Sequence, residues 1–341
     1  MSSQMEAVAV LLFTSCLVLT VDVLCASAQF TGTEMPCEDF SPSASAPSSV
    51  HELRPADINV VAAVGDSLTA GTGIAGNNIL DVFREYRGLS WSIGGDDNLT
   101  TVTTLPNILK YYNRNLTGFS VGIGKEETPQ AFLNQAVGGA KSNTSFYCQV
   151  PRAVVNLIEP LHILGLREMH MDPSLKCPTY LMEIICPCVV LPKANSKALQ
   201  MLEDTNRMYQ RSLHELVESG LYDTRSDFTV VIQPFLRDII LPRLPDGRPD
   251  RSFFSADCFH LTQKAHTMLA RSLWNNMLEP LGNKTAIQDF TTEINLKCPT
   301  KTSPYICTFI NSDYRYTGPP PTPGPITVST PRRRRGRLSR I

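Results

Sequence analysis

The sequence predicts an α/β fold in which a mostly parallel sheet carries helices on both faces. Three short apolar runs, at residues 58–64, 153–159 and 228–233, include β-branched side chains and are typical of buried parallel strands. Apolar residues recur at helical spacing over 199–217 and over 265–273, which indicates two amphipathic helices. Because strands that alternate with helices form parallel sheets covered on both faces, these segments favour that architecture.

Length and composition narrow the possibilities further. The 341 residues suggest one large domain rather than two small ones. Hydrophobic residues make up 42% of the chain and charged residues 18%, which is ordinary for a globular protein with a real core. The formal net charge is only -1, so nothing in the bulk charge indicates nucleic acid, and we expect no nucleic-acid partner.

The N-terminal residues predict export. Ala7–Leu24 is a mostly apolar run that ends shortly before Ala26-Ser27-Ala28, a small-x-small pattern for cleavage. We therefore expect residues 1–28 to be a signal peptide. The alternative is a signal anchor, because the first six residues lack Lys and Arg and Asp22 interrupts the apolar run.

Potential glycosylation sites agree with export. N-x-Ser/Thr sequons without an intervening proline predict N-glycans at Asn98, Asn115, Asn143 and Asn283. Beyond the first apolar run, no stretch is long enough to cross a bilayer. The sequence thus predicts a secreted protein without a transmembrane segment in its mature chain.

Cysteine usage points to the same compartment. An even number of cysteines remains after residue 28, which in an exported chain indicates disulfides. They are Cys37, Cys148, Cys177, Cys186, Cys188, Cys258, Cys298 and Cys307. The pairing stays open, since eight cysteines allow 105 arrangements. A zinc site at Cys177, Cys186 and Cys188 is the alternative, but no histidine stands beside them at ligand spacing.

The chain divides into four parts by composition. After the signal, residues 29–52 are rich in Ser and Pro and predict a loose leader. Residues 53–310 form the predicted folded domain, and 311–341 form a tail. In that tail a polyproline-like spacer precedes the arginines between Arg332 and Arg340. The tail is expected to be disordered, with attachment to anionic surfaces such as lipid or heparin-like glycans as the alternative.

Ser67 is the candidate nucleophile. The apolar run 58–64 leads directly into Gly65-Asp66-Ser67-Leu68, and a strand that ends in a Gly-rich turn is where open α/β sheets hold their sites. Such a turn presents a serine hydroxyl clear of the backbone, where a base can take its proton. The structural alternative is that Ser67 only caps the following helix.

Asp257 and His260 are the candidate partners of this serine. They lie three residues apart just before the second amphipathic helix. On a tight turn this spacing lets the carboxylate bind the imidazole Nδ1–H, fix its tautomer and support the imidazolium. We expect His266, on the same helix, to be a surface residue.

Several segments resemble one known family. They are VAAVGDSLTAGTGI, YRGLSWSIGGDDNLTTVTTLPNILKYYN, LNQAVGGAKS, FFSADCFHLTQKAH and LWNNMLEPLG. With GDSL near the start and DxxH near the end, their order resembles the GDSL/SGNH serine esterases and lipases, and a repeat unit of animal membrane-associated phospholipase B. The resemblance covers residues 55–305. It implies an SGNH-hydrolase-like three-layer sandwich that cleaves acyl esters of phospholipids or lysophospholipids.

The resemblance also implies the role of each site residue. Ser67 corresponds to the nucleophile, His260 to the base and Asp257 to the group that orients it. The backbone N–H groups of Ser67 and a glycine form the oxyanion hole; this glycine aligns with Gly139, with Gly138 as the alternative. Each such donor is worth about 2.7–4 kcal/mol. The family implies no metal or cofactor.

One expected segment is missing. The family has a buried strand that ends in Gly-x-Asn-Asp, whose Asn is a further oxyanion donor, yet residues 141–148 run almost directly into 151–154. The sheet is therefore expected to lack one central strand. The membrane-associated relatives also end in a transmembrane segment, which the arginine tail replaces here. The alternative function is a catalytically impaired, lipid- or glycan-binding non-enzyme.

Overall fold

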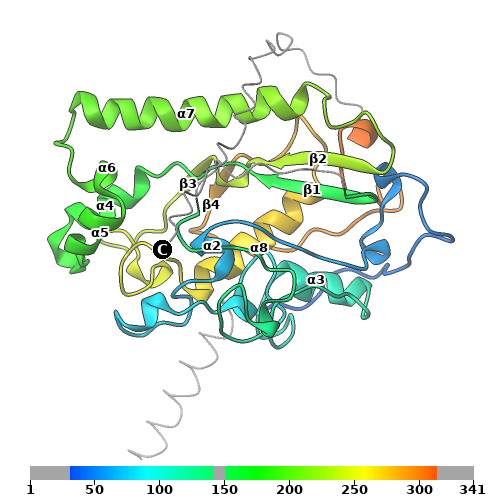
Figure 1. The fold of residues 1–341 in the computed structure, drawn as a ribbon, viewed down its shortest axis with the longest axis horizontal. Helices are drawn as coiled ribbons and strands as arrows, with labels where there is room; N and C mark the ends of the chain where they lie inside the picture. The colour runs from blue at the N-terminus through cyan, green and yellow to red at the C-terminus, as the bar shows by residue number, and fades with distance from the viewer. Residues whose placement is uncertain (1–30, 141–149, 313–341) are drawn as a thin grey trace, which may run out of the picture.

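The fold is α/β, as predicted, and its strands are parallel (Figure 1). The computed structural model describes residues 31–140 and 150–312. β1 (Ala153–Ile158) pairs in parallel with β2 (Phe228–Gln233), in a register that sets Ala153 opposite Phe228. β3 (Asp238–Ile240) pairs in parallel with β4 (Ile287–Asp289). Two of the three predicted strands are therefore confirmed as β1 and β2.

Two long helices lie on opposite sides of the β1–β2 sheet (Figure 1). Both predicted helices are confirmed, as α7 and α8. The α-helices are α2 (Ser67–Ala70), α3 (Leu105–Tyr112), α4 (Gly165–Met171), α5 (Thr179–Ile185), α6 (Pro187–Val190), α7 (Lys197–Glu218) and α8 (Gln263–Met277). Short 3₁₀ turns lie between them.

Alternation along β2 explains why both faces are covered. Phe228, Val230 and Ile232 point to one face and form a buried cluster with Val217 of α7. α8 contacts β2 as well and lies on the other side of the sheet in Figure 1. The predicted inner stripe of α8 is buried throughout, whereas Tyr209 in the predicted stripe of α7 is 57% exposed. α8 is therefore a core helix and α7 a surface helix.

His266 on α8 is buried, so the expectation that it lies on the surface is wrong. Its side chain belongs to a helix that is buried on nearly all sides. The backbone N–H of Trp91 donates to His266 Nδ1 at 3.3 Å. Burial and the neighbouring His260 lower the pKa of His266 to about 3, so the ring is neutral at physiological pH.

The apolar run 58–64 is not the buried strand that its composition predicts. It is extended, but only isolated parallel bridges form, from Val60 to Thr117 and from Ala63 to Asn134. Val60 is 56% exposed and Val64 is 51% exposed. The physical reason is that, in the part of the chain that the structure describes, the run has hydrogen-bonded neighbours along one edge only.

Backbone hydrogen bonds identify the open edge. Asn59, Val61, Ala63 and Gly65 bond to the 117 and 133–137 segments, whereas in the described part of the chain Val60, Ala62 and Val64 make no backbone hydrogen bond. On β1 the amides of Ala153 and Glu159 donate to the β2 side, so the alternate residues direct their backbone groups away from it. Within the described residues, the 58–64 run and β1 thus each carry an unpaired edge, as expected if a central strand is absent.

Residues 31–52 are not a loose leader. Thr33 N donates to Leu99 O, and Cys37 forms a disulfide with Cys298. Val50–Glu52 is a 3₁₀ turn in which Val50 and His51 are buried. A Ser/Pro-rich composition removes regular structure but does not prevent packing, because a disulfide and backbone bonds to the domain order this segment. The predicted signal peptide and the Arg332–Arg340 tail lie outside the described residues.

Candidate active site

The Asp257–His260 turn is assembled as the spacing predicts. His260 Nδ1 and Asp257 Oδ2 are 2.6 Å apart, and Asp257 Oδ1 accepts the backbone N–H groups of Phe259 and His260 at 3.0 Å each. Asp257 is 1% exposed and His260 is 8% exposed. Burial alone would raise the pKa of Asp257, but these hydrogen bonds and the His260 ring outweigh it and lower the pKa. The carboxylate is therefore ionised and holds the imidazole.

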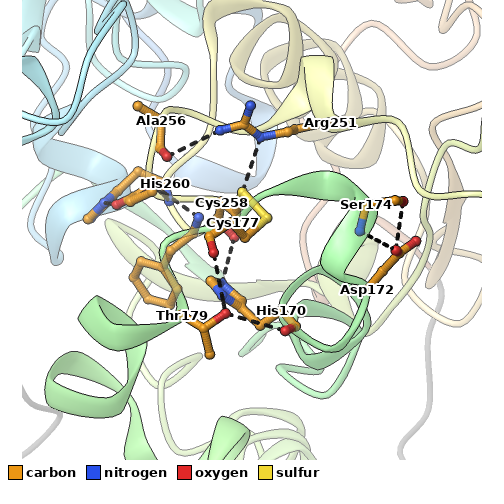
Figure 2. The surroundings of a disulfide bond; sticks show 11 residues. His170, Asp172, Ser174, Cys177, Thr179, Arg251, Ala256, Cys258 and His260 are labelled. Atoms are coloured by element: carbon orange, nitrogen blue, oxygen red, sulfur yellow. Dashed lines mark hydrogen bonds and ion pairs between the residues drawn. A yellow bond between two sulfur atoms is a disulfide. The ribbon is translucent and has the colours of Figure 1, made fainter.

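A disulfide ties this turn to the helices around α4 (Figure 2). Cys258, between Asp257 and His260, is bonded to Cys177 and has a φ of 55°. Figure 2 shows the disulfide between the His260 turn and His170, whose Nε2 lies 3.2 Å from Cys258 O. A covalent bond, a left-handed residue and a buried carboxylate together fix the orientation of the His260 ring.

Ser67 opens the short helix α2 at the end of the 58–64 run. Asp66, not Ser67, is the N-cap: its Oδ1 accepts the N–H of Leu68 at 3.0 Å. The alternative in which Ser67 is only a helix cap is therefore wrong. Gly71 ends the helix with a φ of 77°, and a side chain there would collide with Tyr86 O. Ser67 is half-buried.

Ser67 and His260 come from distant parts of the chain. Among the described residues, neither Ser67 Oγ nor His260 Nε2 makes a hydrogen bond. The two parts are joined nearby, since Ser255 Oγ, two residues before Asp257, donates to Gly73 O at 2.9 Å in a buried contact. The structure thus joins Asp257 to His260 directly and links the Ser67 turn to them only through its neighbours.

Gly139 lies on the turn that follows residues 133–137, the segment that hydrogen-bonds to the 58–64 run. Val137 N donates to Gly65 O at 3.0 Å, which brings this turn beside the backbone that leads to Ser67. Gly139 has a φ of 74° and is exposed, so a glycine is needed for conformation rather than for space. A Cβ atom added at Gly138 would lie 3.8 Å from Glu85 Oε1.

Arg87 is a residue of this region that the sequence analysis did not single out. Its side chain is 1% exposed and binds the segment before the glycine turn, at Asn134 and Ala136. Its position in YRGLS carries no spacing signal that would distinguish it from any arginine, so only the fold shows that it is buried.

A second buried charged cluster follows β1. Glu159 Oε2 accepts from His214 Nε2 at 3.0 Å, and Arg237 binds the same carboxylate at 2.9 Å. Burial alone would lower the pKa of His214, but its hydrogen bonds to Glu159 and Glu218 outweigh this and raise the pKa to about 9. This cluster stabilises the connection between α7 and the β1 end of the sheet.

The remaining predicted sites divide by location. Asn98, Asn115 and Asn283 are exposed, and Asn143 lies outside the described residues. Among the described residues two disulfides form, while Cys186, Cys188 and Cys307 are free thiols. Cys148 lies outside the described residues. Within residues 31–140 and 150–312, no group of three or more His, Cys, Asp or Glu side chains could hold a metal. Nor does any helix in these ranges have the length and apolarity to cross a membrane.

Comparison with known proteins identifies relatives. The chain is 43% identical to human "Phospholipase B1, membrane-associated" over 343 residues, which covers 82% of this chain and 24% of that protein. It is 46% identical to the mouse protein of the same name over 347 residues, covering 84% of this chain and 24% of the relative. The chain thus spans about a quarter of the length of these curated relatives. No solved structure matches it.

These alignments agree with a missing internal segment. The match to the human protein extends over 343 residues although only 82% of this 341-residue chain takes part. The relative therefore carries additional residues inside the matched region. The sequence profile of the GDSL-like Lipase/Acylhydrolase family matches residues 61–273, which contain the Ser67 turn and the Asp257–His260 turn. The chain belongs to the GDSL-like lipase/acylhydrolase family.

Proposed function

We propose that this chain is a secreted serine hydrolase that cleaves acyl esters of phospholipids or lysophospholipids through Ser67, His260 and Asp257. The observation that carries the proposal is the 2.6 Å hydrogen bond between His260 Nδ1 and Asp257 Oδ2 in a buried turn. It leaves Nε2 of the same ring available as a base. The phospholipid class is supported by the names of the relatives.

The reaction proceeds by acyl transfer. Ser67 Oγ attacks the ester carbonyl carbon while its proton passes to His260 Nε2. The carbonyl oxygen becomes an oxyanion that accepts from the N–H groups of Ser67 and Gly139. The imidazolium gives this proton to the departing alcohol, and the acyl group remains bonded to Ser67 Oγ as an ester. Water, deprotonated by His260, then attacks this ester, releases the fatty acid and restores Ser67.

The test uses the chain without residues 1–28, made in a secretory host. Labelling by a fluorescent fluorophosphonate and turnover of a lysophospholipid should both be lost in Ser67→Ala. A matched control is Ser92→Ala, because Ser92 is not one of the three proposed residues and its buried Oγ has no hydrogen-bond partner among the described residues. Full activity in Ser67→Ala would show that the site is wrong.

The unpaired edges favour a second candidate, a non-catalytic lipid- or glycan-binding protein. Ser67 follows a run that lacks a neighbour along one edge, so its turn depends on fewer contacts than an intact central strand would supply. Folded protein that melts cooperatively, resists the fluorophosphonate and still binds phospholipid vesicles would favour this candidate. Efficient turnover by the purified chain would exclude it.

Export is proposed on separate grounds. Two disulfides and three exposed sequon asparagines suit an oxidising secretory compartment. Protein recovered from the medium should lose apparent mass after removal of N-glycans. Retention of the chain in the cytosol with reduced cysteines would contradict secretion.

A further inference from the structure

The guanidinium of Arg87 is buried against the segment that leads to the proposed oxyanion glycine. Nη1 donates to Asn134 O and Asn134 Oδ1, each at 2.9 Å. Nη2 donates to Ala136 O at 2.7 Å, and Nε donates to Gly124 O at 2.7 Å. Because the planar guanidinium presents its donors in a fixed geometry, it sets the position of the 134–136 backbone more strictly than a lysine could.

Asn134 extends this arrangement to the nucleophile helix. Its Nδ2 donates to Thr69 O, inside α2, at 3.3 Å and to Ser120 Oγ at 3.2 Å. Ser90 Oγ donates to the same Thr69 carbonyl at 2.7 Å. Asn134 is fully buried. Arg87 and Asn134 therefore connect the helix that begins at Ser67 with the segment that ends in Gly139.

Charge balance gives Arg87 a second role. Glu85 is buried, and its Oε2 accepts from Arg87 Nη2 at 2.6 Å. Its Oε1 pairs with Lys125 at 2.6 Å and faces Gly138. An unneutralised carboxylate beside the glycine turn would oppose a developing oxyanion, since buried charges interact strongly in a medium of low dielectric constant.

We propose that Arg87 is a positioning residue for the oxyanion hole, which holds the Gly138–Gly139 turn beside Ser67 and neutralises Glu85 next to it. This inference rests on the proposed function. It predicts that loss of the guanidinium destabilises the transition state more than it weakens substrate binding, since the oxyanion forms only as the carbonyl is attacked.

The experiment compares Arg87→Lys with Arg271→Lys on a soluble short-chain ester. Arg271 is a matched control: it is 2% exposed and donates to Gly32 O and Ile294 O, away from the site. Arg87→Lys should lower kcat about 10²-fold with little change in KM, and slow fluorophosphonate labelling of Ser67 to match. The pH profile of kcat/KM should not shift, because Asp257 and His260 are untouched. Arg271→Lys should lower Tm without lowering kcat.

A surface substitution keeps the inference testable if Arg87→Lys does not fold. Lys125 is 63% exposed, so Lys125→Met should fold, and it leaves Glu85 less neutralised. Its kcat should fall roughly threefold, more at low ionic strength. The added change Glu85→Gln should restore kcat. Lys301→Met, at an exposed site, is the control.

The outcomes separate the two proposals. If Ser67 is labelled and required while Arg87→Lys and Lys125→Met keep normal kcat, the role of Arg87 is wrong and the proposed function stands. If the Ser67→Ala variant turns over the ester as well as the wild-type chain does, the proposed function fails and the role of Arg87 fails with it. Equal losses of kcat in Arg87→Lys and Arg271→Lys would reduce Arg87 to a structural residue.

Discussion

The two turns that carry the proposed chemistry are built in different ways. In the Asp257–His260 turn, both carboxylate oxygens of Asp257 accept hydrogen bonds within four residues, and the Cys177–Cys258 disulfide holds the turn from outside. The Ser67 turn has a helix cap and a glycine, but its position depends on neighbours distant in sequence, including Asn134. The extended 58–64 run before it lacks a hydrogen-bonded partner along one edge among the described residues. A turn built from contacts within its own residues thus depends little on the sheet, whereas a turn positioned by distant residues depends on the segments beside it.

The strongest test of this comparison is Asp257→Asn. An amide cannot hold the same imidazole tautomer or support the imidazolium, so kcat should fall about 10⁴-fold. Asp250→Asn is the matched control, because Asp250 also caps a turn through Ser252 N but does not contact His260. Kinetics with a soluble ester and a thermal melt would check both. A loss of less than about tenfold in Asp257→Asn would mean that the turn does not orient a catalytic base.

Removal of each disulfide in turn should distinguish an effect on the His260 turn from an effect on the stability of the whole fold. Replacing Cys177 and Cys258 by Ser should cost about 2–5 kcal/mol of stability and also lower kcat, because the His260 turn loses its tether. Replacing Cys37 and Cys298 by Ser should cost a similar amount but leave the kcat of the folded fraction unchanged. Denaturant unfolding and kinetics measure the two effects. Equal kcat in both double variants would contradict a role for the first disulfide in the turn.

The pH dependence of stability tests charges outside both turns. The pKa of His214 is raised from 6.5 to about 9, so its contribution is fully present below pH 6.5 and is lost as the pH rises through about 9. His214→Gln should therefore cost about 1–2 kcal/mol of stability at pH 6 and almost nothing above pH 10, where the wild-type ring is neutral. The cost at pH 6 is modest because solvent still reaches part of the ring.

His162 provides a control of opposite sign for this measurement. Burial lowers its pKa, so the wild-type residue costs stability as the pH falls below 6.5. His162→Gln should then stabilise the protein at acid pH and have no effect at alkaline pH. Melting temperatures from pH 5 to 10 measure both variants. A constant difference across this range would contradict the assigned ionisation.

The smallest expected effect concerns the open edge. Val64 is 51% exposed, so Val64→Thr should change stability by less than about 0.5 kcal/mol. Val231, in β2, is fully buried, and Val231→Thr should cost roughly 1–3 kcal/mol because it places a hydroxyl in the core. Denaturant midpoints compare the two. A large loss in Val64→Thr would mean that the edge is covered in solution.

The elements that depend on local pattern could be predicted from the sequence. The sequence predicts β2 because it is a short, continuous apolar run with β-branched side chains, and α8 because its apolar residues recur at helical spacing. The Asp257–His260 contact follows from spacing alone, since three residues on a turn suffice. The 58–64 run has the composition of a buried strand, but burial also requires neighbours, and among the described residues this run has them along one edge only.

Features that depend on distant contacts could not be read from the sequence. His266 has no sequence signal that separates it from a surface histidine, and the depth of α8 in the fold decides its environment. Arg87 is buried because residues 37 to 49 positions further on surround its guanidinium. The pairing of Cys177 with Cys258 depends on how α4 and the His260 turn meet.

The Cys37–Cys298 disulfide has a consequence for the order of synthesis. It joins residues 261 positions apart, and nearby Ile306 N donates to Leu53 O. Both contacts bring the first described residues against the last. Nearly the whole domain must therefore have left the ribosome before Cys37 can form its disulfide with Cys298. Until then residues 31–53 remain accessible to chaperones, and the domain closes as a late, post-translational event.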